Sequence, residues 1–142
     1  MVKIVFYNLN LHMITTKLIE FINQNQALLR GILTIPENTD NKSIVIMVGG
    51  FERSATTEKK FKLLADKLAE EKLISFRFDA TDCGLSDGDF YNMTVESLAA
   101  DLSEAVSYFQ GLGYEKFSVV GHSLAGCAIS LLINKVNFEK IV

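Results

Sequence analysis

Short apolar runs alternate with amphipathic stretches along most of this chain. Three runs are apolar almost throughout, which is typical of strands buried on both faces of a sheet; they span residues 43–48, 73–78 and 117–120. Each precedes a stretch whose apolar residues have helical spacing: residues 57–72, Thr94 to Gly111, and residues 124–136. A further strand begins at Phe138–Val142. Strand–helix–strand repeats with short links predict parallel strand pairing.

The amino-terminal part of the chain has a different pattern. Two strands, Lys17–Ile22 and Ala27–Ile35, are predicted on either side of the polar turn Asn23–Gln26, and this arrangement indicates an antiparallel hairpin. The whole chain therefore predicts an α/β fold, with a doubly wound, mostly parallel sheet and an antiparallel N-terminal hairpin. We expect a single, incomplete domain over residues 1–142, in which residues 1–14 are a poorly defined leading segment.

Two of the predicted helices have one apolar face each. In the first, apolar side chains recur at i, i+3, i+4, i+7 and i+8, a spacing that marks a buried face: Phe61, Leu64, Ala65, Leu68 and Ala69. In the second, the corresponding residues are Val95, Leu98, Leu102, Ala105, Val106 and Phe109. Thr94 is a suitable N-cap for the second helix, and Gly111 and Gly113 end it. The third stretch, residues 124–136, is apolar nearly all round, so we expect a central helix that is covered on all sides.

Composition and charge narrow the classes of function. The net charge is −3, so the chain lacks the basic composition of proteins that bind nucleic acid. The longest strongly apolar run, Leu124–Ile133, is about half of the ~20 residues that a membrane span needs, and the start of the chain lacks the pattern of a signal peptide. Cys83 and Cys127 have neither disulfide-framework nor metal-site spacing. We therefore expect a cytoplasmic protein with no cofactor, no metal, and no nucleic-acid or membrane partner.

The segment Val119–Gly126 carries the candidate chemistry. A strand runs into Ser123 and a helix leaves it, which is the sequence pattern of a nucleophile elbow. A serine nucleophile needs a base and an oxyanion hole, and the elbow exposes the serine oxygen while pointing the next backbone N–H at the reacting carbonyl. The turn is tight, so its neighbours must be small; Gly121 and Ala125 satisfy this, and Gly126 gives the helix further room. A turn that only closes a strand–helix joint is the alternative interpretation.

A second turn, Gly49-Gly50-Phe51, follows the first of the buried strands. Here the chain resembles the α/β-hydrolase superfamily, specifically small serine esterases of the feruloyl-esterase and acyl-peptidase-like kind, which carry His-Gly-Phe or His-Gly-x at this turn. Gly49 stands in place of that histidine, and Ala125 in place of the usual elbow glycine. The resemblance implies an oxyanion hole formed by the backbone N–H groups of Phe51 and Leu124, and a small ester or acyl substrate. A simple glycine turn before a helix is the alternative.

A third segment supports the resemblance. The family carries Asp-x-Arg-Gly-x-Gly-x-Ser-x-Gly after the next strand; Thr81 and Asp82 replace the arginine and the first glycine, and the matching residues are Asp79, Gly84, Ser86 and Gly88. In the family this segment is a structural loop behind the site. Its carboxylates could also suggest calcium, but they lack the spacing of a helix-loop-helix calcium site, so we expect a solvated acidic turn: Asp79, Asp82, Asp87 and Asp89.

The resemblance runs from Lys17 to Val142 but covers only the first part of the family domain. α/β-Hydrolases order their triad as Ser, then Asp or Glu, then His, so both partners of Ser123 are expected beyond Val142. The chain has 2 histidines. His12 precedes the sheet, and His122 adjoins the serine, where side chains of a turn diverge, so we expect His122 to be a packed residue of the elbow. Loss of the base costs roughly 10⁶ in kcat, so the chain alone is expected to be inactive or nearly so.

Two other functions compete with the esterase interpretation. One is a non-catalytic interaction module that kept the hydrolase fold; the missing triad partners favour it, and the well-kept elbow opposes it. The other is a nucleotide-binding domain, but Cys127 and Ala128 stand where a phosphate loop needs Lys and Ser or Thr. Whichever holds, a strand at Phe138–Val142 would be a hydrophobic sheet edge, and such an edge predicts self-association.

Overall fold

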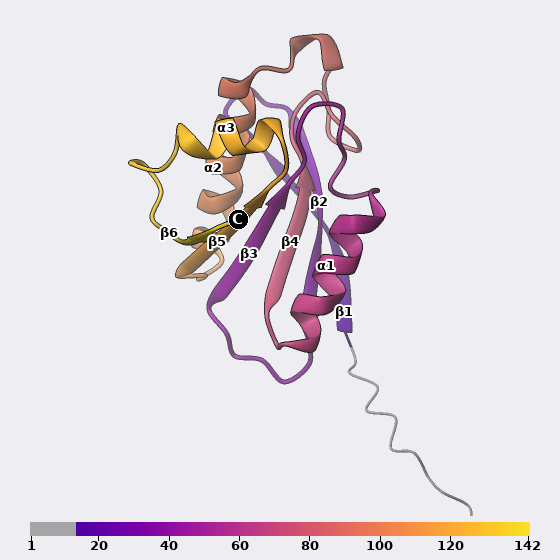
Figure 1. Ribbon diagram of the computed structural model, residues 1–142, viewed down its shortest axis with the longest axis vertical. Helices are drawn as coiled ribbons and strands as arrows, with labels where there is room; N and C mark the ends of the chain where they lie inside the picture. The colour runs from indigo at the N-terminus through magenta and orange to yellow at the C-terminus, as the bar shows by residue number, and fades with distance from the viewer. Residues whose placement is uncertain (1–13) are drawn as a thin grey trace, which may run out of the picture.

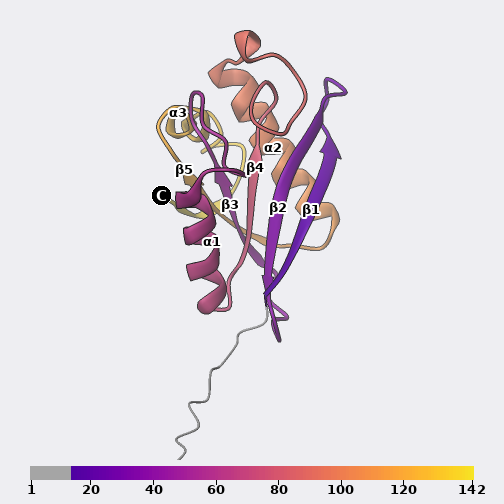
Figure 2. The ribbon, with the colours of Figure 1, turned by 90° about the vertical axis from the view of Figure 1, so that its right-hand side faces the viewer.

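The computed structural model describes residues 14–142, which form a twisted six-stranded sheet with helices on both faces (Figures 1 and 2). The strands are β1 (Ile14–Ile22), β2 (Leu28–Pro36), β3 (Ser43–Val48), β4 (Ile74–Asp79), β5 (Lys116–Gly121) and β6 (Phe138–Ile141). They lie in the order β1-β2-β4-β3-β5-β6. The pairs β1–β2 and β2–β4 are antiparallel, and the pairs β4–β3, β3–β5 and β5–β6 are parallel. The predicted α/β fold with an antiparallel N-terminal hairpin is confirmed.

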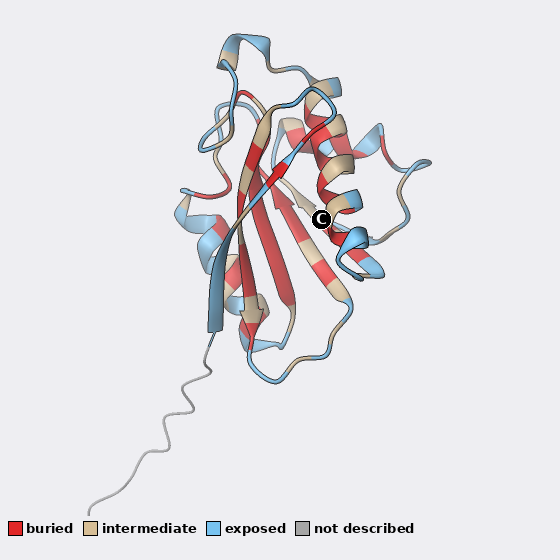
Figure 3. Ribbon diagram, turned by 180° about the vertical axis from the view of Figure 1, so that it is seen from behind, coloured by how far each residue is buried: buried red, intermediate tan, exposed pale blue. Residues whose placement is uncertain are grey.

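The helices divide the core into two layers. On one face of the sheet lies α1 (Lys59–Glu70); α2 (Val95–Gly111) and α3 (Leu124–Ser130) cover the other, and a short 3-10 helix, η1 (Phe90–Asn92), precedes α2. β4 is buried along its whole length (Figure 3). Its side chains alternate between the layers: Ile74, Phe76 and Phe78 join the core under α2, whereas the Arg77 guanidinium donates to the Ala55 carbonyl before α1 at 3.1 Å.

The helix starts and core faces follow the sequence pattern closely. Thr94 caps α2: its hydroxyl accepts the Ser97 N–H, and the Ser97 hydroxyl accepts the Thr94 N–H, each at 3.0 Å. This reciprocal pair satisfies two amides that the helix itself cannot use. All but one of the α2 residues predicted to face the core are buried, with Val95 packed at its margin. Phe109 of α2 lies at the aromatic centre of the core. Its ring contacts that of Phe76 edge-on, with the ring centroids 4.7 Å apart.

Two predictions about the apolar stretch 124–136, one on its helical length and one on its burial, are wrong. The apolar stretch from Leu124 does not continue as a helix to Val136: α3 ends at Ser130, and turns lead the chain from there to β6. α3 is also not covered on all sides. One side of this helix packs on the sheet and on α2, and no other described element packs on its outer side. Leu131 is 46% exposed and Ile133 is 55% exposed.

The α1 face is only partly covered. Phe61, Ala65 and Ala69 are buried as predicted, but Leu64 and Leu68 are half-buried. These two leucines line an apolar groove of 410 Å³ that continues over Val120 of β5 to Val142. Within residues 14–142, no helix is long and apolar enough to cross a membrane.

Candidate functional site

Ser123 occupies a strained turn between β5 and α3. Its backbone has φ 57° and ψ −118°, a region that residues with a side chain rarely adopt. Flanking hydrogen bonds hold the turn: the His122 N–H donates to the Val48 carbonyl at 3.3 Å, and the Gly126 N–H donates to the Ser123 carbonyl at 2.9 Å. Ser123 itself is exposed. The turn therefore presents a serine hydroxyl to solvent at the carboxyl ends of β3 and β5.

Small residues make this turn possible, although not all of those predicted. A Cβ atom added at Gly121 would lie 2.4 Å from the Cδ1 of Ile129 and 3.3 Å from the carbonyl carbon and the Cβ of Ala125, so Ile129 would have to move to admit a side chain. Ala125 is completely buried. Gly126 differs, because an added Cβ would meet no atom within 4 Å. The predicted steric role of Gly126 is therefore wrong: its outer side belongs to the uncovered face of α3.

The Gly49-Gly50-Phe51 turn lies directly against the elbow. A Cβ added at Gly50 would lie 2.4 Å from the His122 carbonyl oxygen and 3.0 Å from both the Leu124 amide nitrogen and the Ser123 Cβ. Gly49 is equally constrained, since its Cβ would lie 2.1 Å from the carbonyl oxygen of Arg53. Two turns that are more than seventy residues apart in the sequence thus meet with only glycine backbone between them.

The two amides that the resemblance assigns to an oxyanion hole are both available. No hydrogen bond between residues of the described part, 14–142, uses the N–H of Phe51 or of Leu124. Leu124 is the first residue of α3, where amides point out of the helix and the dipole favours negative charge. An oxygen that accepts from the Leu124 N–H would therefore lie beside Gly50 and Ser123.

No general base reaches Ser123 among residues 14–142. The Ser123 hydroxyl makes no hydrogen bond to another described residue. His122 was predicted to be packed into the elbow, and this is wrong: His122 is exposed, because no described element covers the elbow from above. His12 lies outside the described residues. Cys83 is not an alternative nucleophile, since burial, followed by the nearby Asp79 and Glu58 carboxylates, raises the pKa of its thiol to about 11 and leaves little thiolate at neutral pH.

Asp79, the first residue of the acidic loop, is a buried structural anchor. Its carboxylate accepts the Ser54 hydroxyl at 3.0 Å, the Thr56 amide at 3.1 Å and the Leu85 amide at 2.9 Å. It also fills the space where a Cβ of Gly84 would lie, 2.1 Å from its Oδ2 atom. These bonds tie the loops after β3 and β4 together behind the elbow.

The rest of the loop is only in part the solvated turn that was predicted. Asp82 is buried and has φ 70°, at the position where the resemblance puts glycine, and its carboxylate accepts the Asp89 amide at 2.8 Å. Asp87 and Asp89 are exposed. A hydrogen bond from Arg30 at 3.0 Å holds the pKa of Asp87 below its usual value. Within residues 14–142, no group of three or more His, Cys, Asp and Glu side chains could hold a metal ion.

An aromatic pair beside the site was not predicted from the sequence. The ring of Phe51 packs against that of Phe90 from η1, with the centroids 4.9 Å apart and the planes tilted by 58°. The chain segments that carry them follow different strands and are about forty residues apart. No local pattern marks such a pair, because each phenylalanine stands alone in a polar loop.

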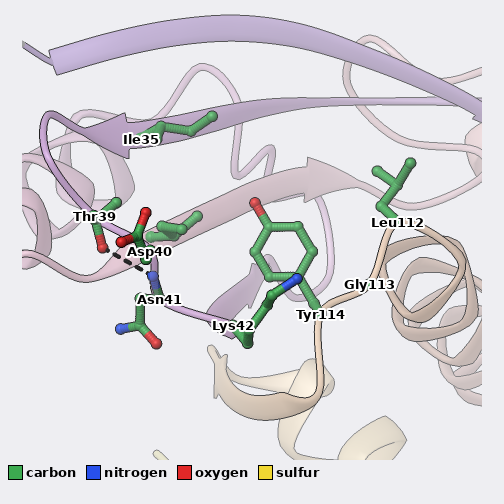
Figure 4. Close-up of a pocket in the computed structure, with 9 residues that line it drawn as sticks. Ile35, Thr39, Asp40, Asn41, Lys42, Leu112, Gly113 and Tyr114 are labelled. Carbon is green, nitrogen blue, oxygen red and sulfur yellow. Dashed lines mark hydrogen bonds between the residues drawn. The ribbon is translucent and has the colours of Figure 1, made fainter.

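A cavity at the opposite end of the sheet is unrelated to the elbow. It has a volume of 350 Å³ and lies at the amino ends of β3 and β4, between the loop after β2 and the end of α2 (Figure 4). Lys42 and Tyr114 border it, and burial raises the pKa of Tyr114. Ser123 follows the carboxyl end of β5, so this cavity lies a full strand length away from it.

Comparison with known proteins shows which family and which solved structures this chain is similar to. The model of a family described as "Putative serine esterase (DUF676)" matches residues 38–141. No curated protein matches the sequence. Three similar solved structures are Est1E from Butyrivibrio proteoclasticus with ferulic acid bound (TM-score 0.77, 20% identity), the Pyrococcus furiosus esterase Pf2001 (0.73, 20%) and the hypothetical protein PA2218 from Pseudomonas aeruginosa (0.78, 21%).

These structural matches cover most of this chain but not most of its neighbours. The matched part is 87%, 87% and 95% of this chain, and 50%, 48% and 43% of the respective neighbour. The chain thus spans about half the length of the solved structures that it resembles. At such identities the likeness establishes the α/β-hydrolase type of fold.

Proposed function

The chain belongs to the putative serine esterase family, and we propose that it carries the nucleophile and the oxyanion hole of a serine ester hydrolase. In this proposal Ser123 is the nucleophile, and the N–H groups of Phe51 and Leu124 are the oxyanion donors. The observation that carries it is the contact between the glycine turn and the elbow, in which a Cβ at Gly50 would lie 3.0 Å from both the Leu124 nitrogen and the Ser123 Cβ.

The proposed reaction proceeds through an acyl-enzyme. The Ser123 Oγ atom attacks the ester carbonyl carbon, its proton passes to a base, and the carbonyl oxygen becomes an oxyanion held by the amides of Phe51 and Leu124. Collapse of this tetrahedral intermediate breaks the bond to the alcohol oxygen, which takes up a proton, and leaves the acyl group on the serine. Water then attacks the acyl-enzyme in the same way and releases the acid.

We propose that the base and its acidic partner are supplied by polypeptide outside residues 1–142. The solved neighbours are about twice as long, and His122 lies next to the nucleophile in the chain instead of opposite it. Without a base, turnover falls by roughly 10⁶. The isolated chain should therefore bind a transition-state analogue at Ser123 yet hydrolyse esters very slowly or not at all.

A boronic acid tests this proposal because its equilibrium binding to the serine oxygen needs no general base in the protein. Methylboronic acid forms a B–O bond to a serine oxygen at equilibrium and releases the serine proton to the buffer, and the resulting tetrahedral anion resembles the proposed intermediate. Titration followed by ¹⁵N–¹H NMR should shift the amide signals of Phe51 and Leu124 in the wild type but not in Ser123→Ala. If these two amides do not respond, the proposal fails, and the alternative of a non-catalytic module with a hydrolase fold gains support.

Self-association is a second proposal for this chain. β6 is the last strand at one edge of the described sheet; its last residue, Ile141, is 49% exposed, and Val142, which follows it, is 76% exposed. The apolar groove beside α1 ends at the same edge. Exposed strand edges pair readily with other chains, so we propose that a second chain covers Phe138–Val142 at high protein concentration.

A further inference from the structure

The loop between β3 and α1 has two parts. The first is the turn that carries Phe51, which the Arg53 N–H closes by donating to the Gly50 carbonyl at 3.1 Å. The two ends of this turn touch, because a Cβ added at Gly49 would lie 2.1 Å from the Arg53 carbonyl oxygen. The second part, which we call the arm, is residues 54–56 and leads from the turn toward α1. A displacement of the arm therefore moves one end of the turn that carries Phe51.

The arm contains two buried carbonyl groups that need a donor. Ala55 and Thr56 are both buried, and no backbone N–H within residues 14–142 donates to their carbonyl oxygens. Arg77 of β4 supplies the donor: its Nη1 group donates to the Ala55 carbonyl at 3.1 Å and also to the Thr56 carbonyl. Without this guanidinium both carbonyls would stay buried and unpaired, and each would cost the full penalty of its lost hydration. Arg77 thus holds the arm in place.

Arg77 is a buried cation whose side chain has no other hydrogen-bond partner in the part of the chain that the structure describes. It forms no ion pair with those residues, and its Nε atom is buried without a partner. Burial lowers the pKa of Arg77, while the Asp66 and Asp79 carboxylates raise it, and a guanidinium stays protonated in proteins. A buried charge without an ion pair is costly. The two bonds to the arm are therefore what offsets this cost.

Asp79 holds the same arm from the same face of β4. Side chains two residues apart on a strand point to one face of the sheet, so Arg77 and Asp79 both reach the arm. Asp79 accepts the Ser54 hydroxyl and the Thr56 amide, and it also accepts the Leu85 amide of the loop after β4. Arg77, by contrast, donates only to the arm within the described residues. A change at Arg77 is therefore the more selective way to release the arm.

We propose that Arg77 is a positioning residue of the oxyanion hole: by fixing the arm, it fixes the direction in which the Phe51 N–H points. This inference rests on the proposed function, because it needs the amides of Phe51 and Leu124 to be the oxyanion donors. The Leu124 N–H belongs to the first turn of α3, and its direction is set by the elbow and that helix. Loss of Arg77 should therefore weaken one donor and leave the other in place.

The test observes the two donors separately in one protein. Methylboronic acid is titrated into the wild type, Arg77→Met and Arg77→Lys, and the amide signals of Phe51 and Leu124 are followed by NMR up to saturation. Methionine is unbranched and has no N–H donor. In Arg77→Met the Leu124 signal should still shift on binding, the shift of Phe51 should shrink, and the affinity should fall about ten- to a hundredfold, less than for a donor lost outright. Arg77→Lys keeps the charge and can donate to a carbonyl, so it should restore part of both the Phe51 shift and the affinity.

Asp101→Asn is the matched control, since it removes a buried charge that does not touch the arm. The Asp101 carboxylate is 2% exposed and accepts the Thr81 amide at 2.6 Å and the Asn23 side chain at 2.8 Å. This variant should lose stability and yet keep the wild-type affinity and both amide shifts. An amide spectrum first shows that each variant is folded, and Arg77→Lys carries the test if Arg77→Met is not.

The outcomes separate this inference from the proposed function. Arg77 is not a positioning residue if Phe51 responds fully in the folded Arg77 variants, or if the responses of Phe51 and Leu124 fall together. The same conclusion follows if Asp101→Asn reproduces the loss at Phe51, because the effect would then be general destabilisation. If neither amide of the wild type responds to methylboronic acid, the proposed function fails and this inference fails with it.

Discussion

Gly50 gives the sharpest prediction, because the contact between the two turns depends on its lack of a side chain. In Gly50→Ala the new Cβ would lie 2.4 Å from the His122 carbonyl oxygen and 3.0 Å from the Leu124 nitrogen. Both neighbours are backbone atoms, so the turn itself must move away from the elbow. Removing one oxyanion donor costs other serine enzymes about 10²–10³ in kcat, or about 2.7–4 kcal/mol. Because the turn moves without losing an N–H group, we expect methylboronic acid to bind about ten- to a hundredfold more weakly.

The control for this prediction is Gly126→Ala in the same elbow. Its Cβ meets no atom within 4 Å, and alanine favours a helix over glycine by roughly 0.5–1 kcal/mol, so affinity should stay unchanged and the melting temperature should not fall. An amide NMR spectrum of each variant first confirms that it is folded. The reasoning is refuted if Gly50→Ala binds like the wild type, or if Gly126→Ala loses as much affinity.

Three further predictions concern the rest of the chain. At about pH 8, a thiol reagent should modify the exposed Cys127 well before Cys83, whose pKa is raised to about 11; equal rates in single-cysteine variants would contradict the burial of Cys83. The pKa of Asp87 is lowered, so its bond to Arg30 stabilises the fold above the ordinary aspartate pKa of about 3.9, and this contribution is lost as the pH falls below that value. Asp87→Asn should therefore lower the melting temperature at neutral pH and in low salt but not in strong acid. An equal loss at both pH values would count against the ion pair. Light scattering during size-exclusion chromatography should show species larger than a monomer at high concentration, and a Lys at Ile141 (Ile141→Lys) should reduce them; a clean monomer in the unsubstituted chain would exclude pairing through Phe138–Val142.

The parts of the fold that depend on local pattern could be predicted from the sequence. The strand Ser43–Val48 has the predicted bounds, because a continuous apolar run between turn residues leaves little choice of structure. The N-cap at Thr94 was likewise predictable, since capping needs only a side chain and the next turn of the helix. The tight turn at Ser123 could be located because Gly121, Ser123 and Ala125 are neighbours in sequence and such a turn restricts their size; its role as a nucleophile elbow stays a prediction.

What failed depends on elements that are distant in sequence. The spacing around Leu124 could not show that α3 would be covered from one side only, because coverage is set by which other elements are present. His122 was predicted to be packed, but it is exposed for the same reason: no described element covers it. Asp82 was expected in a solvated turn, yet it is buried, and its carboxylate accepts the Asp89 amide of its own loop. The sequence shows the charge of Asp82 but not this donor.

The measurement that tests the central claim most directly is hydrolysis of p-nitrophenyl acetate by this chain and by Ser123→Ala. The claim is that the nucleophile and the oxyanion hole of a serine esterase are assembled here without a general base. It predicts that the wild type and Ser123→Ala release p-nitrophenol at the same rate, although only the wild type binds methylboronic acid at Ser123. Turnover that disappears in Ser123→Ala would contradict the claim, because a base, such as His122 or His12, would then be reaching the serine within this chain.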